Sequence, residues 1–316
     1  MRTQLISNGT PDGSAHQALK HKAVLLQEVL ALLDIKESDK VFDGTLGSFG
    51  HGQAILQKLG EKGVYIGNDL DEDAIERAKS ILQKKSFPAE IHFCQGNFKD
   101  AEKCLEALGL KKVDKILMDL GWSQDQFEDS GRGFSFLKDE PLVMSYSKDS
   151  DLSASEIVNE WSEETLADII YGFGEERFAR RIAKAIVKAR ESAPIKSSLE
   201  LAQIVESAYP SFTKGKKIHP ATKTFQALRI TVNRELEVLE KALDALHSVL
   251  SCGGRMAVIS FHSLEDRIVK RKFLAWEREG LGKRITKKPI IASKEELKEN
   301  KRARSAKLRV YEKEND

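Results

Sequence analysis

The sequence predicts an α/β fold in which a parallel, doubly wound sheet is interrupted by a mostly helical insertion. Two features of the pattern lead to this prediction. Short apolar runs typical of strands alternate with helical segments at 24–120 and again after residue 250, as in parallel sheets. Between about residues 129 and 212, helical periods and loops occur without a strand-like run. A chain of 316 residues is long enough for one large domain or two smaller ones.

The first half of the sheet is expected from four strands separated by helices. A helical face at 24–33 comes before the first strand. The predicted strands are 41–43, 64–69, 91–94 and 113–120, and the helices between them are 51–59, 71–84 and 100–108. Asp71, Glu72 and Asp73 support the second helix, because acidic side chains in a first turn interact favourably with the positive end of the helix dipole.

The helical insertion follows, and the sheet then resumes. The insertion's predicted helices are 153–172, 175–191 and 198–208, before a long helical stretch at 219–249. A turn at 252–254, a strand at 256–261, a helix at 264–277 and a strand at 307–311 complete the pattern. We therefore expect a disordered N-terminus at 1–18, an α/β domain formed by 19–130 and 216–316, and a helical domain at 131–215.

Charge is distributed unevenly along the chain. The net charge is +2, but the segment from Glu265 to the end holds 17 Lys/Arg and 10 Asp/Glu, a balance of +7. Such a basic tail suggests a polyanionic partner, and a solvated charged tail would look the same. With 41% hydrophobic and 32% charged residues, the chain is expected to be globular and soluble.

The cysteines and the N-terminus indicate a cytoplasmic protein. Cys94, Cys104 and Cys252 lack the spacing of metal ligands, and we expect them to be reduced thiols. The N-terminal segment lacks the apolar core of a signal peptide, and no apolar run approaches the length of a membrane span. No membrane partner is therefore expected. A homodimer is compatible with the sequence, which does not determine the oligomeric state.

The segment 41–51 is the most informative part of the chain. A short strand ends in an acidic residue and a turn with three glycines, at the sheet edge where nucleotide-like ligands bind. Its spacing matches neither the dinucleotide fingerprint nor the Walker loop, so alone it is equally compatible with a structural turn. Asp69 ends the next strand and could bind both ribose hydroxyls, while Phe98 could pack on an adenine. With Asp119 at the fourth strand end, these residues predict a cleft for an adenosine-containing cofactor.

Ordered motifs extend this prediction to a specific family. They are residues 21–26 (HKAVLL), 43–47 (DGTLG), 96–98 (GNF), 118–121 (MDLG), 132–136 (RGFSF), 174–179 (GEERFA), 219–222 (HPAT), 225–230 (FQALRI), 259–267 (ISFHSLEDR) and 302–309 (RARSAKLR). With them, the chain resembles the MraW (RsmH) family of bacterial S-adenosylmethionine-dependent methyltransferases, which modify the N4 amine of a decoding-centre cytosine in 16S ribosomal RNA. The match runs from about residue 20 to residue 312 in the family's order.

The resemblance implies a fold, a cofactor site and a partner. The fold would be the Rossmann-like sheet of class I S-adenosylmethionine-dependent methyltransferases, with the helical insertion recognising 16S ribosomal RNA in the small ribosomal subunit. The implied cofactor-binding residues are Phe49, Gly50, His51, Asp69, Phe98, Asp119 and Gln126. Asp119 would also be catalytic, accepting hydrogen bonds from the target amine and helping its proton to leave; a cap on the following turn is the alternative. His51 could equally bind through its backbone, with the ring merely packed. No metal is expected.

A second set of residues is expected to bind the RNA substrate. It comprises Arg132, Phe134, Arg177, Arg181, Arg229, His262 and Ser263. Arg132 beside Phe134 suits phosphate pairing and base stacking, and Arg177 with Arg181 begins a basic stripe on the helix predicted at 175–191. His262 follows a strand and should emerge at the same sheet edge. The structural alternatives are core phenylalanines, a solvated helix face and a buried histidine.

Four departures from the family's pattern are present, and two of them, Phe49 and the segment 141–147, leave other functions open. Phe49 stands where the family usually has glycine, Trp122 replaces a small residue, and residues 123–126 lack the family's usual proline. Residues 141–147 read Pro-Leu-Val-Met-Ser-Tyr-Ser, where the family usually has Leu-Asp-Met-Arg-Met-Asp. One alternative is a non-enzymatic ribosome-assembly or RNA-binding protein on the same fold. Another is a methyltransferase that acts on a protein or a small molecule. The glycine spacing makes a nicotinamide enzyme remote.

Overall fold

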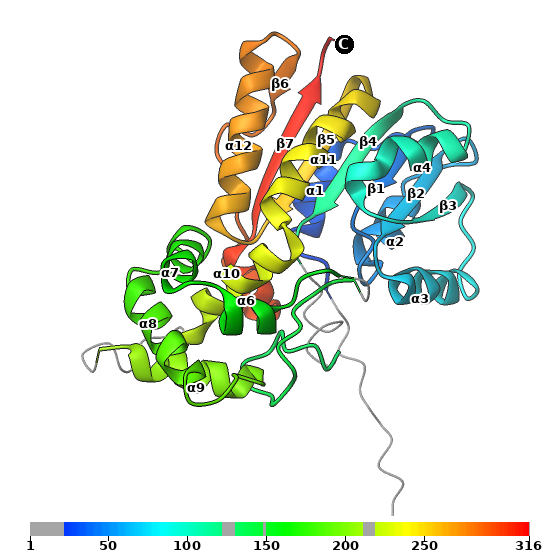
Figure 1. The fold of residues 1–316 in the computed structure, drawn as a ribbon. Coiled ribbons are helices and arrows are strands. Elements are labelled where there is room, and N and C mark those ends of the chain that lie inside the picture. Colours follow the sequence, from blue (N-terminus) through cyan, green and yellow to red (C-terminus); the bar gives the residue numbers. More distant parts are fainter. Residues whose placement is uncertain (1–21, 122–129, 148–149, 211–218, 316) are drawn as a thin grey trace, which may run out of the picture.

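The computed structural model describes residues 22–121, 130–147, 150–210 and 219–315. Within them, seven strands form one sheet in the order β3-β2-β1-β4-β5-β7-β6 (Figure 1). The strands are β1 Lys40–Asp43, β2 Val64–Asp69, β3 Glu90–Gln95, β4 Val113–Asp119, β5 Leu250–Ser260, β6 Gly282–Arg284 and β7 Lys307–Lys313. The first five are parallel, and β7 is antiparallel to both neighbours. The predicted parallel α/β sheet is confirmed, while the short β6 was not predicted.

Helices cover both faces of the sheet, because successive strand side chains point to opposite faces. The helices of this part are α1 Leu26–Leu33, α2 Gly50–Leu56, α3 Glu72–Leu82, α4 Ala101–Ala107, α11 Glu235–Val249, α12 Ser263–Arg278 and α13 Lys294–Glu299, with short 3-10 turns η1 Phe98–Asp100 and η3 Lys301–Ser305. One apolar cluster joins α1, α2 and α3 to the sheet, and another joins α4, α11 and α12. In the described ranges, no helix has the length and apolar character needed to cross a membrane.

The insertion is a helical lobe with its own apolar core. Its helices are α6 Ala154–Glu160, α7 Glu163–Gly172, α8 Ala179–Arg190, α9 Ser198–Ala208 and α10 Ala221–Asn233. Figure 1 shows them gathered on one side of the sheet domain, next to the start of α11. Phe225, Leu228 and Val232 of α10 belong to the lobe's core, which therefore extends beyond residue 215. This helix connects the lobe to the sheet domain.

Three predicted helical stretches have different bounds in the structure. The stretch 153–172 is two helices, because the chain is extended at Trp161 and Ser162, whose hydroxyl caps α7. The stretch 175–191 begins later, at Ala179, after Glu175 adopts a left-handed backbone with φ 48°. The stretch 219–249 is divided by Arg234, which has φ 50°.

The prediction that all three cysteines are reduced thiols is wrong for two of them. Cys94 on β3 and Cys104 on α4 form a disulfide, with their Cα atoms 6.0 Å apart. The path of the chain from β3 through η1 to α4 brings them within the usual distance for such a bond, which their sequence spacing did not reveal. Cys252 is free and exposed.

The basic C-terminal segment is folded rather than a tail. It contains α12, β6, α13, η3 and β7, and β7 pairs with β5 inside the sheet. Several of its cations are committed to internal ion pairs, such as Arg309 with Asp266 and Arg284 with Glu277. Its net charge alone therefore does not identify a polyanion-binding surface.

Candidate active site

A cavity of about 570 Å³ lies where the parallel strands end, between the sheet and the start of α11. This volume falls in the range of roughly 300–1,000 Å³ that is usual for small-molecule sites. One half is lined by the loop after β1, Asp69, Phe98 and Asp119. The other half is lined by side chains from the insertion, α11 and α12, namely Tyr146, Gln226, Arg229, Asn233, Glu235, His262 and Glu265. Asp119 lies at the tip of β4, where the two halves meet.

The glycine loop after β1 is held close to the neighbouring strand ends. A Cβ on Gly44 would overlap the sulfur of Met118, so a larger residue there would force the Met118 side chain to move. The backbone N–H of Gly47, which has φ 51°, donates to the Asp69 carboxylate at 2.9 Å. The loop and the tip of β2 therefore form one rigid wall of the cavity.

Phe49, predicted to bind cofactor, turns its ring away from the cavity. The ring is buried and packs edge-on against Tyr65 and Phe93. Its backbone has φ 64° at the start of α2, and its neighbours Ser48 and Gly50 line the cavity instead. The bulk of Phe49 thus occupies the core and leaves the loop open, which the sequence did not indicate.

Asp69 and Phe98, two of the residues predicted to bind cofactor, line the first half of the cavity. The Asp69 carboxylate accepts the N–H groups of Gly47 and Asp71, at 2.9 Å each, which fixes its orientation. Burial raises the pKa of Asp69, although these two donors oppose the shift. Each carboxylate oxygen has further acceptor capacity for hydroxyl groups. Beside Phe98, a Cβ on Gly96 would meet open space, so the backbone there is accessible to a flat ring.

His51 and Asp119 face each other in the middle of the cavity. The His51 ring contacts the carbonyl of Val24 through Nε2 at 3.0 Å, and its Nδ1 lies 3.6 Å from Asp119 Oδ2. Burial lowers the pKa of His51 to about 4. Burial, with the nearby carboxylates of Asp43 and Glu265, raises the pKa of Asp119 to about 8. Asp119 Oδ1 is buried and has no hydrogen-bond partner among the described residues.

Arg229 lines the other half and forms a two-pronged ion pair with Glu235. Its Nε and Nη2 donate to the two carboxylate oxygens at 2.8 and 3.0 Å. The Tyr146 hydroxyl donates to the same carboxylate at 2.8 Å. Burial opposes the charge of Arg229, but Glu235 outweighs it and raises the pKa of the guanidinium. Arg229, Glu235 and Tyr146 therefore form a fixed set of polar contacts that links α10, α11 and the loop before α6.

His262 also faces the cavity, from the N-cap of α12. Its Nδ1 accepts the backbone N–H of Glu265, and the Glu265 carboxylate accepts the backbone N–H of His262 in return. This capping box fixes the ring, and Nε2 lies 3.3 Å from Glu265 Oε1. The His262 ring is therefore held against the Glu265 carboxylate at the cavity wall.

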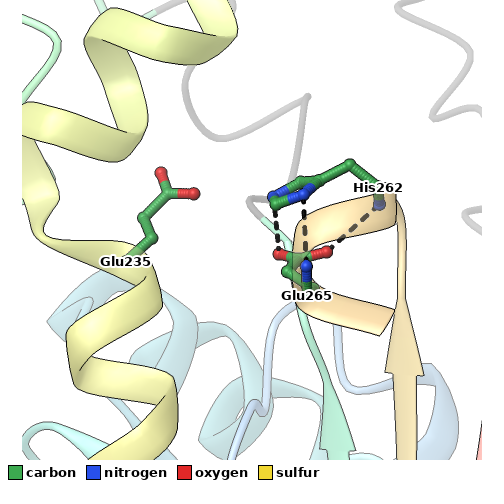
Figure 2. Close-up of side chains that lie close together, drawn as sticks. All are labelled: Glu235, His262 and Glu265. Carbon is green, nitrogen blue, oxygen red and sulfur yellow. Dashed lines mark hydrogen bonds and ion pairs between the residues drawn. The ribbon is translucent and has the colours of Figure 1, made fainter. Parts of the chain in front are cut away.

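Glu235, His262 and Glu265 come close enough to resemble a metal site (Figure 2). Their ligand atoms lie within 4.8 Å of one another. However, Glu235 is already neutralised by Arg229, and Glu265 accepts the backbone N–H groups of Phe261 and His262. A cation would have to displace these donors and lie close to the guanidinium, so the chemistry of the cluster does not favour one.

Several predicted RNA-binding residues lie outside the cavity. Arg132 donates to the carbonyls of Ser145 and Tyr146, and the buried Phe134 ring stacks on Tyr146. Ser263 donates to Glu175 of the insertion. The side chains of Arg132, Phe134 and Ser263 therefore make contacts within the protein.

The remaining predicted side chains are exposed or fall outside the described residues. Arg177 and Arg181 are exposed on the insertion, and Arg177 lies before α8 over the ring of Phe178. Gln126 lies outside the described residues.

Several cavity residues were not predicted. Glu265 belongs to the matched segment 259–267, from which only its neighbours His262 and Ser263 were predicted as site residues. Tyr146 lies in the segment that departs from the family's pattern and could have been noticed for that reason. Glu235 follows the break after α10, which the sequence did not reveal. Lys301, Arg302 and Arg304 of η3 also line the cavity, beside the glycine loop.

One protein family matches almost the whole chain. A model of the MraW methylase family matches residues 18–314. Three similar relatives carry the name ribosomal RNA small subunit methyltransferase H. That of Deinococcus deserti is 47% identical over 302 residues, which are 95% of this chain and 96% of the relative. That of Clostridium botulinum is 44% identical, over 93% of this chain and 99% of the relative. That of Deinococcus radiodurans is 45% identical, over 96% of this chain and 93% of the relative.

Proposed function

We propose that this chain, which belongs to the MraW methylase family and is a methyltransferase, methylates small-subunit ribosomal RNA. The seven-stranded sheet is the Rossmann-like sheet of class I S-adenosylmethionine-dependent methyltransferases. The proposed substrate is a decoding-centre cytosine of 16S ribosomal RNA, methylated on its N4 amine in the cytoplasm. The names of the relatives support ribosomal RNA as the substrate. The observation that carries the proposal is the unpartnered Asp119 oxygen between the two cavity halves.

The cofactor half suits S-adenosylmethionine, which supplies an electrophilic methyl group on a sulfonium. Asp69 would bind the ribose hydroxyls with the acceptor capacity that its two backbone donors leave. Phe98 would flank the adenine, and the glycine loop would lie against the methionine part. Lys22, whose ammonium also pairs with Glu299, and Arg302 line the cavity, and cationic groups there suit the carboxylate of that part.

Asp119 would activate the target amine. A cytosine N4 amine is a poor nucleophile, because its lone pair is delocalised into the ring. Asp119 Oδ1 would accept a hydrogen bond from the amine and hold it in line with the methyl group. The His262 ring, with its Glu265 partner, and the Arg229–Glu235 pair lie in the second half, where they would position the base.

The insertion would hold the RNA backbone. Arg181, Lys184 and Lys188 are exposed along one side of α8, and Arg177 precedes them. Cationic side chains at this spacing stay aligned on one helix face. Phosphate contacts of this kind increase affinity without reading sequence, and they weaken as salt is added.

A methyl-transfer assay tests the proposed function. Purified protein would be incubated with methyl-labelled S-adenosylmethionine and small ribosomal subunits, and label in the RNA counted. We expect wild type and Asp73→Ala, an exposed change on α3, to label the RNA. We expect Asp69→Ala to require far more cofactor, and Asp119→Ala to lose activity. Undiminished labelling by Asp119→Ala, or none by wild type, would contradict the proposal.

A further inference from the structure

The His51 ring has a defined proton position. Its Nε2 lies 3.0 Å from the carbonyl oxygen of Val24, which can only accept, so Nε2 carries the ring proton. The ring is neutral, because burial lowers its pKa to about 4. A neutral ring that is protonated on Nε2 has a lone pair on Nδ1. This lone pair faces Asp119 Oδ2 across 3.6 Å.

Every titratable neighbour of Asp119 favours a protonated carboxyl. On α2, His51 presents its Nδ1 lone pair. On β1 and α12, the buried Asp43 and Glu265 add negative charge. Among the described residues, no lysine or arginine forms an ion pair with Asp119, and its Oδ1 has no donor. The carboxyl is thus surrounded by acceptors and negative charge.

We propose that Asp119 holds a proton in the protein without cofactor and releases it when the positively charged sulfonium cofactor binds. This inference rests on the proposed function and deepens it. Asp119 lies where the cofactor half meets the second half, so a fixed positive charge in the first half would stabilise its carboxylate. The demethylated product, S-adenosylhomocysteine, has a neutral sulfur and should leave the proton in place.

The proton count then balances over one turnover. The ionised Asp119 is able to accept a hydrogen bond from the N4 amine. Asp119 takes one N4 proton as the carbon–nitrogen bond forms and the carbon–sulfur bond breaks with its electron pair left on sulfur. The carboxyl ends as it began, protonated beside a neutral sulfur. His51 is a positioning residue here, because its Nδ1 lone pair faces Oδ2 and orients the returned proton toward the ring, which stays neutral.

Calorimetric titration of the two ligands tests this linkage. S-adenosylmethionine and S-adenosylhomocysteine would each be titrated at pH 7 in buffers of different ionisation enthalpy, which gives the protons released. The amino group of the methionine part is common to both ligands, so its contribution cancels in the difference. We expect S-adenosylmethionine to release about one proton more. Its affinity should rise by at most about tenfold per pH unit until pH is near the pKa of Asp119, about 8.

Matched variants assign the proton. Asp119→Asn should abolish the difference between the ligands, and His51→Gln, which removes the Nδ1 acceptor, should reduce it. Asp43→Asn is the control, because Asp43 is a second buried carboxyl whose pKa burial raises to about 7. It should leave most of the difference in place. Equal proton release by both ligands, or a difference that persists in Asp119→Asn, would overturn the inference. Failure of both ligands to bind wild type would instead contradict the proposed function and the inference with it.

Discussion

Phe49 and Gly52 show how one substitution in the glycine loop is accommodated. The Phe49 ring lies over the start of α2 and packs against Tyr65. A Cβ on Gly52 would overlap both the Phe49 ring and the Tyr65 hydroxyl. Glycine in a helix interior normally costs stability, so its presence at position 52 reflects the space that Phe49 needs.

We predict that Gly52→Ala destabilises the protein by about 1–3 kcal/mol, because it overpacks the core beside Phe49. In a helix without such contacts, the same change would stabilise the protein by up to about 1 kcal/mol. The sign of the change in the free energy of unfolding therefore distinguishes the two cases. Urea unfolding of the variant would measure it. In a Phe49→Ala background the cost of Gly52→Ala should fall, since only the overlap with the Tyr65 hydroxyl remains; an unchanged cost there would contradict this account.

Arg229 should contribute to the stability of the folded protein as well as to ligand binding. Arg229→Ala leaves Glu235 buried without its cation, and we predict a loss of about 3–5 kcal/mol. Glu235→Gln with Arg229→Ala should recover part of that loss, since the uncompensated charge is removed. Denaturant midpoints of the single and double variants test this. A cost below about 1 kcal/mol for the single change would show that the pair is not structural.

At the scale of elements, the disulfide encloses the segment that carries Phe98 to the cavity. It links β3 to α4, and Phe98 of η1 lies between its two cysteines in the chain. Closing a short loop restricts the unfolded chain and also holds the loop in the folded state. The cofactor wall on this side thus depends on a covalent bond as well as on packing.

Replacing Cys104 by serine should lower stability by about 2–3 kcal/mol in oxidising buffer, as expected for a closed loop of this length. Cys252→Ser, at an exposed free thiol, is the matched control and should have little effect. Thermal unfolding with and without dithiothreitol would measure both. Equal stability of Cys104→Ser and wild type without reductant would contradict a stabilising disulfide.

The sequence predicted elements with strong local patterns and failed where distant packing decides. Strands β1, β2 and β4 lie where apolar runs ended in Asp43, Asp69 and Asp119. The break at Arg234 has no local signal, because an arginine with positive φ is unusual and is set by how α10 and α11 pack. The pairing of Cys94 with Cys104 likewise depends on the path that the chain takes from β3 through η1 to α4.

At the scale of the whole molecule, the site lies where the sheet domain meets the insertion. Glu175 of the insertion pairs with Ser263 and Arg267 of α12, while α10 brings Arg229 to the cavity. The sequence could predict that Asp69, Phe98 and Asp119 lie close together, since they follow successive strands. It could not predict the Tyr146–Glu235 contact, because these residues are far apart in the chain and come from two regions.

Stability should fall as pH rises toward 8. Folding raises the pKa of Asp119 to about 8, well above the value of roughly 4 in an unfolded chain. The folded state therefore holds more protons in this window, and its stability is lost as pH approaches the folded value. We predict a loss of roughly 1–2 kcal/mol from Asp119 between about pH 6.5 and 8.

Urea unfolding across this range would measure the slope. His51 has the opposite effect on stability, because burial lowers its pKa to about 4. This effect is confined to pH values below about 6.5, where the unfolded histidine is protonated. Asp43 adds to the slope up to its own pKa, about 7. Asp119→Asn should therefore have the flatter profile above pH 7. Identical profiles for wild type and Asp119→Asn would contradict a protonated Asp119.

The most direct test of the central claim is the identity of the methylated base. Small ribosomal subunits from cells lacking this enzyme would be treated with the protein and S-adenosylmethionine, and their RNA digested for mass spectrometry against nucleoside standards. The account predicts new N4-methylcytidine with wild type and none with Asp119→Asn. Methylation at another atom, such as 5-methylcytidine, or no new nucleoside from a protein that binds the cofactor, would contradict it.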